Sequence, residues 1–392
     1  MSGIDDVCVG AVARGDVFGL VVAAASRDGV MHQGAYGLRE AGGGPPMSLD
    51  TTFRLHSMTK AITATAAMQL VERGVLDLDA PLDDLLPGLA RKQVLIGFDP
   101  AGQPVLRPAR GAITLRQLLT HTAGFSYDIW NANTLRYQNE TGFPGPFTGT
   151  NAALGQPLSF DPGDRWHYSI GLDWAGKAVE AASGLDLETY FRRHILDPLG
   201  MVDTTFVQNE EQRARRVAMH RRMADGSLAP FVLDRPERTE YFVGGGGLFG
   251  TVPDYLAFTR ALLAGGGPIL APETVAMMAE NHIGDLNVEP MASQIPASSH
   301  SADFWPGMVQ KWGLSFLINT METPQGRSAG SLAWAGLSNL YYWIDLKKGV
   351  TGVFATQLLP FFDARAVETF RAFETQVYRE TKLPGERAPR RA

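Results

Sequence analysis

The chain is poor in the residues that build disulfide frameworks and metal centres. Among its 392 residues there is a single cysteine, Cys8, which excludes an intrachain disulfide framework and any cysteine-rich metal site. The eight histidines show no His-Glu-x-x-His pattern and no similarly close ligand spacing. We therefore expect a protein with neither a metal ion nor a cofactor.

Long apolar runs and an excess of basic charge are missing as well. No apolar run approaches the roughly 18 residues that span a bilayer. The net charge of −6 disfavours nucleic acid or an anionic membrane as the main partner. What is present is a composition of 45% hydrophobic and 19% charged residues, which is typical of a globular protein with a sizeable core.

Residues 17–25 faintly resemble a signal peptide. However, Asp5, Asp6 and Asp16 make the segment before them acidic rather than basic. The same residues also predict a strand that forms a hairpin with residues 30–36. Cleavage would discard a core strand, so we expect a cytoplasmic protein.

The order of predicted elements favours an α/β (α+β) fold in which both ends of the chain complete one sheet. The first 50 residues have strand-like patterns, helical spacing dominates from about residue 57 to 200, and strands return after residue 230. We expect a discontinuous α/β domain from residues 1–75 and 225–392, and a mainly helical domain from residues 76–224. The active site should lie in the cleft between them. The predicted helices are 115–119, 175–182, 187–196 and 364–378, and the predicted later strands are 314–319, 332–335, 340–345 and 350–357.

Ser57 and Lys60 open an unusually apolar helix. A lysine three residues after a serine lies one turn later on the same helix face, which brings an amine close to a hydroxyl. That pairing can activate a serine as a nucleophile. Residues 61–71 carry no charge, so the helix should be buried and Lys60 should be desolvated. The structural alternative is a serine N-cap followed by a lysine that reaches water, and the Ser-x-x-Lys pattern alone does not decide between the two.

Two further motifs follow this helix. Tyr168 comes after a Pro-Gly loop, where a tyrosine can project into a cleft, and Trp334-Ala335-Gly336 lies in a predicted strand where glycine allows close backbone approach. With these motifs the chain resembles the serine β-lactamase and penicillin-binding-protein superfamily, particularly class C β-lactamases and family VIII carboxylesterases. The resemblance covers nearly the whole chain and includes residues 53–60 (FRLHSMTK), 118–124 (LLTHTAG), 168–169 (YS), 198–201 (PLGM) and 244–248 (GGGGL).

The resemblance implies a β-lactamase-like two-lobed fold, with an antiparallel sheet flanked by helices and an inserted helical domain. It implies that Ser57 is the nucleophile and that Lys60 and Tyr168 move its proton, with either of the two as the general base. The backbone N–H groups of Ser57 and Leu337 would form the oxyanion hole. His121 is implied to be part of a structural motif at a helix end.

Two departures from the family pattern bear on the substrate. Trp334 stands where β-lactamases usually carry the lysine that helps to hold a substrate carboxylate, and Ile170 stands where they usually have asparagine. Together with Ala335 and Gly336, Trp334 is expected to form an apolar substrate-binding wall. Tyr127, Trp130, Trp166 and Trp174 could also line a pocket, although aromatic core packing is the more frequent role.

The departures favour a serine carboxylesterase that hydrolyses short or medium acyl esters through an acyl-enzyme, with weak β-lactam hydrolysis as a side activity. The expected partner is a small-molecule ester. The alternative is an acyltransferase or amide hydrolase on the same fold, since acyl transfer differs from hydrolysis only in the nucleophile that resolves the acyl-enzyme. A β-lactamase or D,D-peptidase is less favoured because of Trp334, and a non-catalytic binding module because Ser57, Lys60 and Tyr168 are all present.

Two other motifs do not support different enzyme classes. Residues 326–330 match the Gly-x-Ser-x-Gly of α/β-hydrolases, but a strand rather than a helix is predicted after Ser328, so we expect a hairpin turn. Gly245, Gly247 and Gly250 match a dinucleotide-binding pattern, but no second βαβ strand follows. We expect these glycines to serve close backbone packing beside the active cleft.

Overall fold

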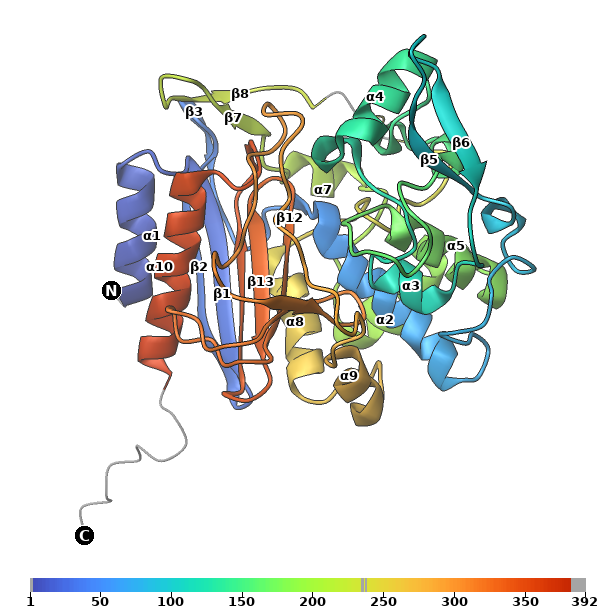
Figure 1. Ribbon diagram of the computed structural model, residues 1–392. Helices are drawn as coiled ribbons and strands as arrows, with labels where there is room; N and C mark the ends of the chain where they lie inside the picture. The colour runs from blue at the N-terminus through green and yellow to red at the C-terminus, as the bar shows by residue number, and fades with distance from the viewer. Residues whose placement is uncertain (1–2, 234–235, 237, 382–392) are drawn as a thin grey trace.

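An eight-stranded antiparallel sheet forms one half of the molecule in the computed structural model, which describes residues 3–233, 236 and 238–381 (Figure 1). Its strand order is β10-β11-β12-β13-β14-β1-β2-β3. The strands are β1 (Gly19–Ser26), β2 (Gly29–Glu40), β3 (Gly43–Pro46), β10 (Gln310–Trp312), β11 (Leu317–Asn319), β12 (Leu332–Gly336), β13 (Leu340–Asp345) and β14 (Val350–Ala355).

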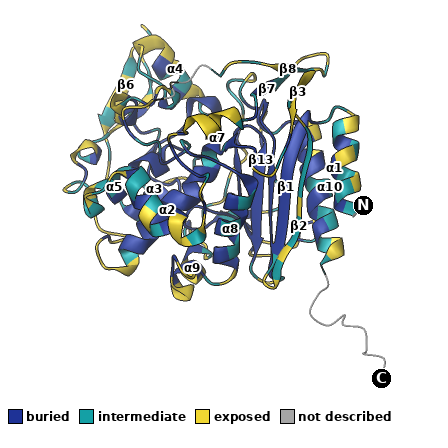
Figure 2. Ribbon diagram, turned by 180° about the vertical axis from the view of Figure 1, so that it is seen from behind, coloured by how far each residue is buried: buried dark blue, intermediate teal, exposed yellow. Residues whose placement is uncertain are grey.

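The two ends of the chain meet in the middle of this sheet. Strand β1 pairs with β2 on one side and with β14 on the other, with Val21 opposite both Ala35 and Ala355. Strands β1, β13 and β14 are almost continuously buried (Figure 2), which explains why their sequences are apolar runs. The predicted hairpin and the predicted strands at 332–335 and 340–345 are confirmed, whereas β11 begins three residues later than predicted. Before it, Ser315 adopts a positive φ of 76° that breaks the strand.

Helices cover both faces of the sheet. Helices α1 (Gly3–Ala13) and α10 (Ala364–Glu380) pack side by side on one face, and α8 (Val252–Leu263) packs against β1, β13 and β14 on the other. The prediction of strand-like structure throughout the first 50 residues is wrong for α1. Ile4, Cys8 and Ala11 recur at helical spacing and form its buried face.

The other half of the molecule is mainly helical and surrounds α2 (Thr59–Glu72) (Figure 1). The predicted helices are found at 115–119, within Gly171–Ser183 and at 187–196, where the last turns are π-helical. The half contains α3 (Leu115–Leu119), α4 (Ala132–Thr141), α5 (Gly171–Ser183), α6 (Leu187–Phe191), α7 (Glu210–Ala214) and an unpredicted hairpin of β5 (Gln93–Phe98) and β6 (Pro104–Pro108). The domain limits proposed from the sequence stay a prediction. Among the described residues, no helix has the length and apolar character needed to cross a membrane.

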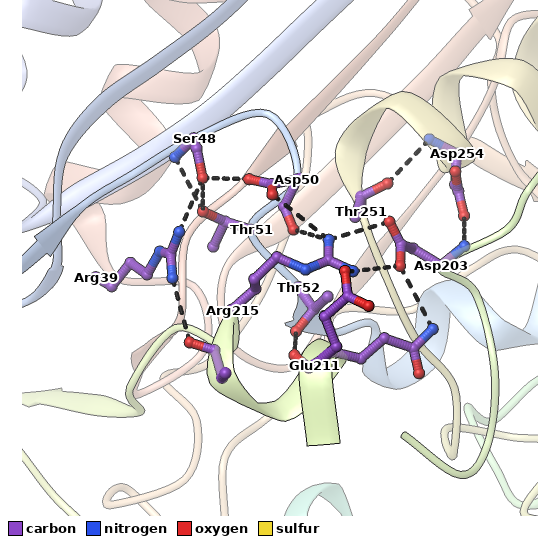
Figure 3. A network of polar contacts seen from close by, with 12 residues as sticks. Arg39, Ser48, Asp50, Thr51, Thr52, Asp203, Glu211, Arg215, Thr251 and Asp254 are labelled. Atoms are coloured by element: carbon purple, nitrogen blue, oxygen red, sulfur yellow. Dashed lines mark hydrogen bonds and ion pairs between the residues drawn. The ribbon is translucent and has the colours of Figure 1, made fainter. Parts of the chain in front are cut away.

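A polar network ties down the segment that leads to Ser57 (Figure 3). Arg215, just after α7, donates hydrogen bonds to the Asp203 carboxylate at 2.6 Å and to the Asp50 carbonyl at 2.7 Å. The backbone N–H of Thr52 donates to the Arg215 carbonyl at 3.1 Å. Asp254, in the first turn of α8, accepts the backbone N–H of Asp203 at 2.9 Å. The approach to the serine is therefore anchored to both halves of the molecule.

Candidate active site

Ser57 lies in a 3-10 turn (His56–Met58) between the short strand β4 (Phe53–Arg54) and helix α2. The helix proper begins at Thr59, two residues after the predicted start. His56 adopts a left-handed conformation with a φ of 47°, which is strained for a residue with a side chain. Its Nε2 lies 2.7 Å from the Oγ of Ser338, just beyond β12. The turn that presents Ser57 is therefore fixed to the sheet.

Lys60 is buried, with 1% of its surface exposed, so the alternative of a lysine that reaches water is wrong. Its Nζ donates to the carbonyl of Gly245 at 2.6 Å, and lies 3.1 Å from the hydroxyl of Tyr127 and 3.3 Å from the Oγ of Ser57. Burial lowers the pKa of Lys60 to about 7, while the nearby Asp173 carboxylate opposes this change. The amine is thus held beside the serine with a pKa close to neutral pH.

Tyr168 approaches Ser57 from the helical half. Its hydroxyl forms a hydrogen bond with Ser57 and accepts one from the indole Nε1 of Trp334 at 3.0 Å. The Nζ of Lys60 lies 4.8 Å from the centre of the Tyr168 ring. Burial raises the pKa of Tyr168, and the hydrogen bonds with Ser57 and Trp334 oppose that effect. At neutral pH the group is therefore a phenol, which can pass a proton in either direction.

His121 supports the tyrosine from behind. It is buried, and its Nδ1 accepts the backbone N–H of Ser169 at 3.2 Å. Its ring centre lies 4.7 Å from that of Tyr168. Burial lowers the pKa of His121 well below its usual value. The structural position implied for this residue at the end of a helix agrees with its place just after α3.

The Trp334-Ala335-Gly336 stretch forms strand β12 next to the serine turn. A Cβ atom on Gly336 would lie 2.6 Å from the carbonyl oxygen of Leu55, so only glycine allows this approach. Trp334, Ala335 and Gly336 all contribute to the walls around Ser57. Leu337 follows the strand and lines the cleft together with Ser57, while the oxyanion-hole role of their N–H groups stays a prediction.

Two contributors to the site carry no motif of their own. Asp173, in the first turn of α5, is buried and accepts the backbone N–H of Gly245 at 2.8 Å. Burial raises the pKa of this carboxyl and the charge of Lys60 opposes the rise. Tyr127, the second contributor, stands out in the sequence only as one of several aromatic residues, and its hydroxyl lies 3.1 Å from the Nζ of Lys60. A signal for Asp173 was available, since it is a carboxylate among the apolar residues of 170–175.

The glycine-rich segment and the Gly-x-Ser-x-Gly motif have the structures predicted for them. Gly245 provides the carbonyl that holds Lys60, and a Cβ atom at Gly245 would lie 2.6 Å from an Asp173 oxygen. Its role in close packing beside the cleft is confirmed. Ser328 lies in the connection between the antiparallel strands β11 and β12, as expected for a turn.

A cavity of about 350 Å³ opens on one side of Ser57 between the two halves of the molecule. Of the four aromatic residues considered from the sequence, Tyr127 and Trp130 line it, while Trp166 lines a smaller hollow and Trp174 is buried in the core. The walls of the cavity are mostly apolar or aromatic, and its charged lining residues are Arg54, Arg238 and Asp173. The apolar and aromatic walls include Tyr127, Trp130, Phe147, Phe206, Val207, Phe242, Val243 and Phe249. Within the described part of the chain, no group of three or more His, Cys, Asp or Glu side chains could hold a metal ion.

Comparisons with known proteins cover almost the whole chain. The family model described as Beta-lactamase matches residues 4–376. A monacolin J acid methylbutanoyltransferase of Aspergillus terreus is 39% identical over 345 residues, which cover 85% of this chain and 83% of the relative. A lovastatin esterase of Penicillium rubens is 34% identical over 400 residues, which cover 96% and 98% of the two chains. The unliganded structure of a simvastatin synthase (LovD) of Aspergillus terreus is 33% identical, covers 97% of this chain and 98% of its own, and superposes with a TM-score of 0.86.

Proposed function

The chain belongs to the β-lactamase family, and within that family we propose that it is a serine acyltransferase, which moves an acyl group from an activated ester to an alcohol. The expected resemblance and fold are thereby established, and the chain is a serine enzyme of the hydrolase and acyltransferase class. The relatives favour the acyltransferase alternative over the carboxylesterase that the sequence placed first. Ester hydrolysis is then the side reaction in which water takes the place of the acceptor.

The size of the cavity beside Ser57 is the observation that carries this proposal. Water can resolve an acyl-enzyme in very little space, so a larger cavity indicates a bulky alcohol, either as the acceptor or as part of the ester. The relative named as a methylbutanoyltransferase favours the acceptor. The cavity of about 350 Å³ is within the range that holds an organic ligand of drug size. Its apolar walls suit a ring system, and the guanidinium groups of Arg54 and Arg238 at its lining suit an acidic substituent. An acceptor alcohol with both features, such as the monacolin J acid in the name of one relative, fits this description.

The proposed first half-reaction transfers the acyl group to the enzyme. The Oγ of Ser57 bonds to the acyl carbon, and the bond from that carbon to the donor's oxygen or sulfur breaks. The proton of Ser57 passes to Lys60 and, through the phenol of Tyr168, to the departing group. The N–H groups of Ser57 and Leu337 stabilise the negative oxygen of the tetrahedral intermediate. In the second half-reaction the acceptor hydroxyl attacks the same carbon and the bond from that carbon to the Oγ of Ser57 breaks. The acceptor's proton returns along the same path to that Oγ.

Lys60 is the better candidate for the base. Its contact with the Gly245 carbonyl must use an N–H, since a carbonyl oxygen only accepts hydrogen bonds. A neutral amine retains one lone pair. At 3.3 Å from the Oγ of Ser57, that lone pair is close enough to accept the serine proton. With a pKa of about 7, a large share of Lys60 is neutral in neutral solution. The buried phenol of Tyr168 is better suited to relay the proton than to remove it.

The test measures transfer and hydrolysis in the same reaction. Purified protein is mixed with p-nitrophenyl acetate, with and without monacolin J acid, and nitrophenol release, free acid and acylated acceptor are quantified. We expect an acyl adduct on Ser57, faster nitrophenol release when the acceptor is present, and an acylated acceptor as the main product. Ser57→Ala should lose all three signals, and Ser328→Ala, which alters the serine of the unrelated motif, should retain them.

Each other outcome assigns a different function. If release is rapid but the acceptor changes neither rate nor product, the protein is the carboxylesterase that ranks second. Efficient cleavage of a chromogenic cephalosporin would instead favour a β-lactamase. If intact protein forms no Ser57 adduct with any activated ester, the catalytic assignment is wrong.

A further inference from the structure

Ser57 lines two cavities of very different size. Besides the large cleft, Ser57 lines a hollow of about 10 Å³, which holds a single group the size of a water molecule or a methyl and shares Trp130 and Tyr168 with the large cleft. Its walls are apolar and aromatic and come from Trp130, Met291, Trp334 and Phe361. A second hollow of about 10 Å³ adjoins it, because Met291 and Trp334 line both. The other walls of this second hollow are mixed, with Trp166 and Phe304 beside the polar Asp303 and Gln310. Met291 and Trp334 are therefore the partition between the hollows.

We propose that the hollow beside Ser57 is the pocket for the acyl group, and that Met291 is the wall that limits the length of the acyl chain. This inference rests on the proposed function, because it assigns the two halves of the substrate to the two cavities. The ligand is a short aliphatic acyl chain, and the alcohol portion of donor or acceptor occupies the large cleft.

The order of events in group transfer decides which cavity takes which half. The acyl group stays on Ser57 while the leaving alcohol departs and the acceptor enters. The exchanging groups need a path to solvent, and the large cleft reaches solvent at Val207, which is 52% exposed. The walls of the small hollow are closed, with Trp130 8%, Met291 6% and Phe361 3% exposed. An enclosed apolar site beside the nucleophile suits the group that remains.

One loop builds this enclosed site. The backbone of Met291 is paired with Ala302 through hydrogen bonds of 2.9 and 3.0 Å in the two directions. The turn between them holds the other walls. The Oγ of Ser299 accepts the indole N–H of Trp130 at 3.1 Å, and the backbone of Phe361 is bonded to the residues on either side of Ser299 at 2.9 Å. Because the backbone is fixed, a substitution at Met291 should change the shape of the pocket rather than the course of the loop.

Removal of the Met291 side chain beyond Cβ should join the two hollows. The experiment compares acylation rates of Ser57 by p-nitrophenyl acetate, butanoate, hexanoate and octanoate. In Met291→Ala we expect the ratio of kcat/KM for hexanoate to that for acetate to rise at least about tenfold, since one methylene in an apolar pocket is worth about that factor. Met291→Val should shift the ratio in the same direction by less, and Met291→Leu, which keeps the volume, should leave it near the wild-type value.

Controls separate this pocket from the large cleft and from general loss of packing. Val207→Ala alters an exposed wall of the cleft and should leave the acyl ratio unchanged. Met278→Ala removes an equally buried methionine that lines none of the described hollows and should also leave it unchanged. Thermal unfolding identifies any variant that has not folded, and Met291→Val then provides the decisive ratio.

Two results would overturn the proposal. Folded Met291→Ala or Met291→Val with the wild-type acyl ratio would show that Met291 does not limit the acyl chain. A change in preference among acetate esters of different alcohols, with the acyl ratio constant, would place the alcohol in the small hollow. Both outcomes still require acylation of Ser57, so they are distinguishable from failure of the proposed function, in which wild-type protein is not acylated by any ester.

Discussion

Replacing Lys60 with methionine should abolish activity and stabilise the fold at neutral pH. The amine is fully buried, and burial lowers its pKa from 10.5 to about 7. An unfolded chain would bind the proton readily at pH 7, whereas the folded protein holds it weakly. The mismatch disfavours folding by about 4 kcal/mol at pH 7 and by about 2 kcal/mol at pH 9. Methionine has similar length and carries no charge.

The hydrogen bonds lost in Lys60→Met offset part of this gain. The contacts of Nζ with Gly245 and Tyr127, and the longer contact with Ser57, are together worth about 2 kcal/mol. The variant should therefore exceed the wild type by about 2 kcal/mol at pH 7 and match it near pH 9. The sign follows from proton uptake, since the wild type gains stability as pH rises from 7 toward 10.5. In the variant Asp173 loses its neighbouring cation, so its carboxyl favours the protonated form more strongly. This effect also makes the stability advantage of the variant over the wild type fall as the pH rises.

Urea unfolding of both proteins at pH 6, 7, 8 and 9 measures this difference. The quantity of interest is the change in the difference between pH 7 and 9, about 2 kcal/mol, because the lost hydrogen bonds contribute equally at each pH. Lys347→Met, at an exposed position, should give a difference that is flat over the same range. A flat difference for Lys60→Met would refute the assignment of a lowered pKa to Lys60, and with it the argument for Lys60 as the base.

Two further predictions concern the partners of the proposed proton relay and oxyanion hole. Trp334→Phe removes the N–H that bonds the Tyr168 hydroxyl at 3.0 Å, and should lower kcat about tenfold with KM little changed. An equal loss in Trp312→Phe, which packs against the same indole at 4.6 Å, would indicate a packing effect instead. Gly336→Ala places a Cβ 2.6 Å from the Leu55 carbonyl, so acylation should slow about 100-fold in a protein with a native circular dichroism spectrum. Unchanged acylation would show that this close approach does not position the oxyanion donors.

The serine–lysine pair was predictable because its geometry is local. The spacing of Ser57 and Lys60 fixes their proximity on a helix, and the uncharged run that follows predicts burial of the lysine. The turn around Ser328 was predictable for the same reason, since strand patterns lie on both sides of it. Tyr168 and Trp334 were associated with the serine only through the family resemblance. No local sequence pattern indicates that the indole of Trp334 donates a hydrogen bond to the hydroxyl of Tyr168.

The rest of the site depends on contacts between distant segments. The bond between Asp173 and Gly245 joins residues 72 apart in sequence, and neither lies in a motif that names the other. Met291 is in an irregular loop whose position depends on a pairing with Ala302. Helix α1 was missed because it is short and its buried face is narrow, and only its contact with α10 makes that face a core surface.

The pairing of β1 with β14 has a consequence for the biosynthesis of the protein. Ser57, Lys60 and Tyr168 leave the ribosome well before β12 to β14, so a growing chain holds the reactive side chains without Leu337 and without the central strands of its sheet. The apolar strand β1 then has an open edge, which makes the nascent chain dependent on protection from aggregation. Pairings over such sequence separations form slowly. Esterolytic activity should therefore emerge only with the last strands, and its recovery during refolding should report closure of the sheet.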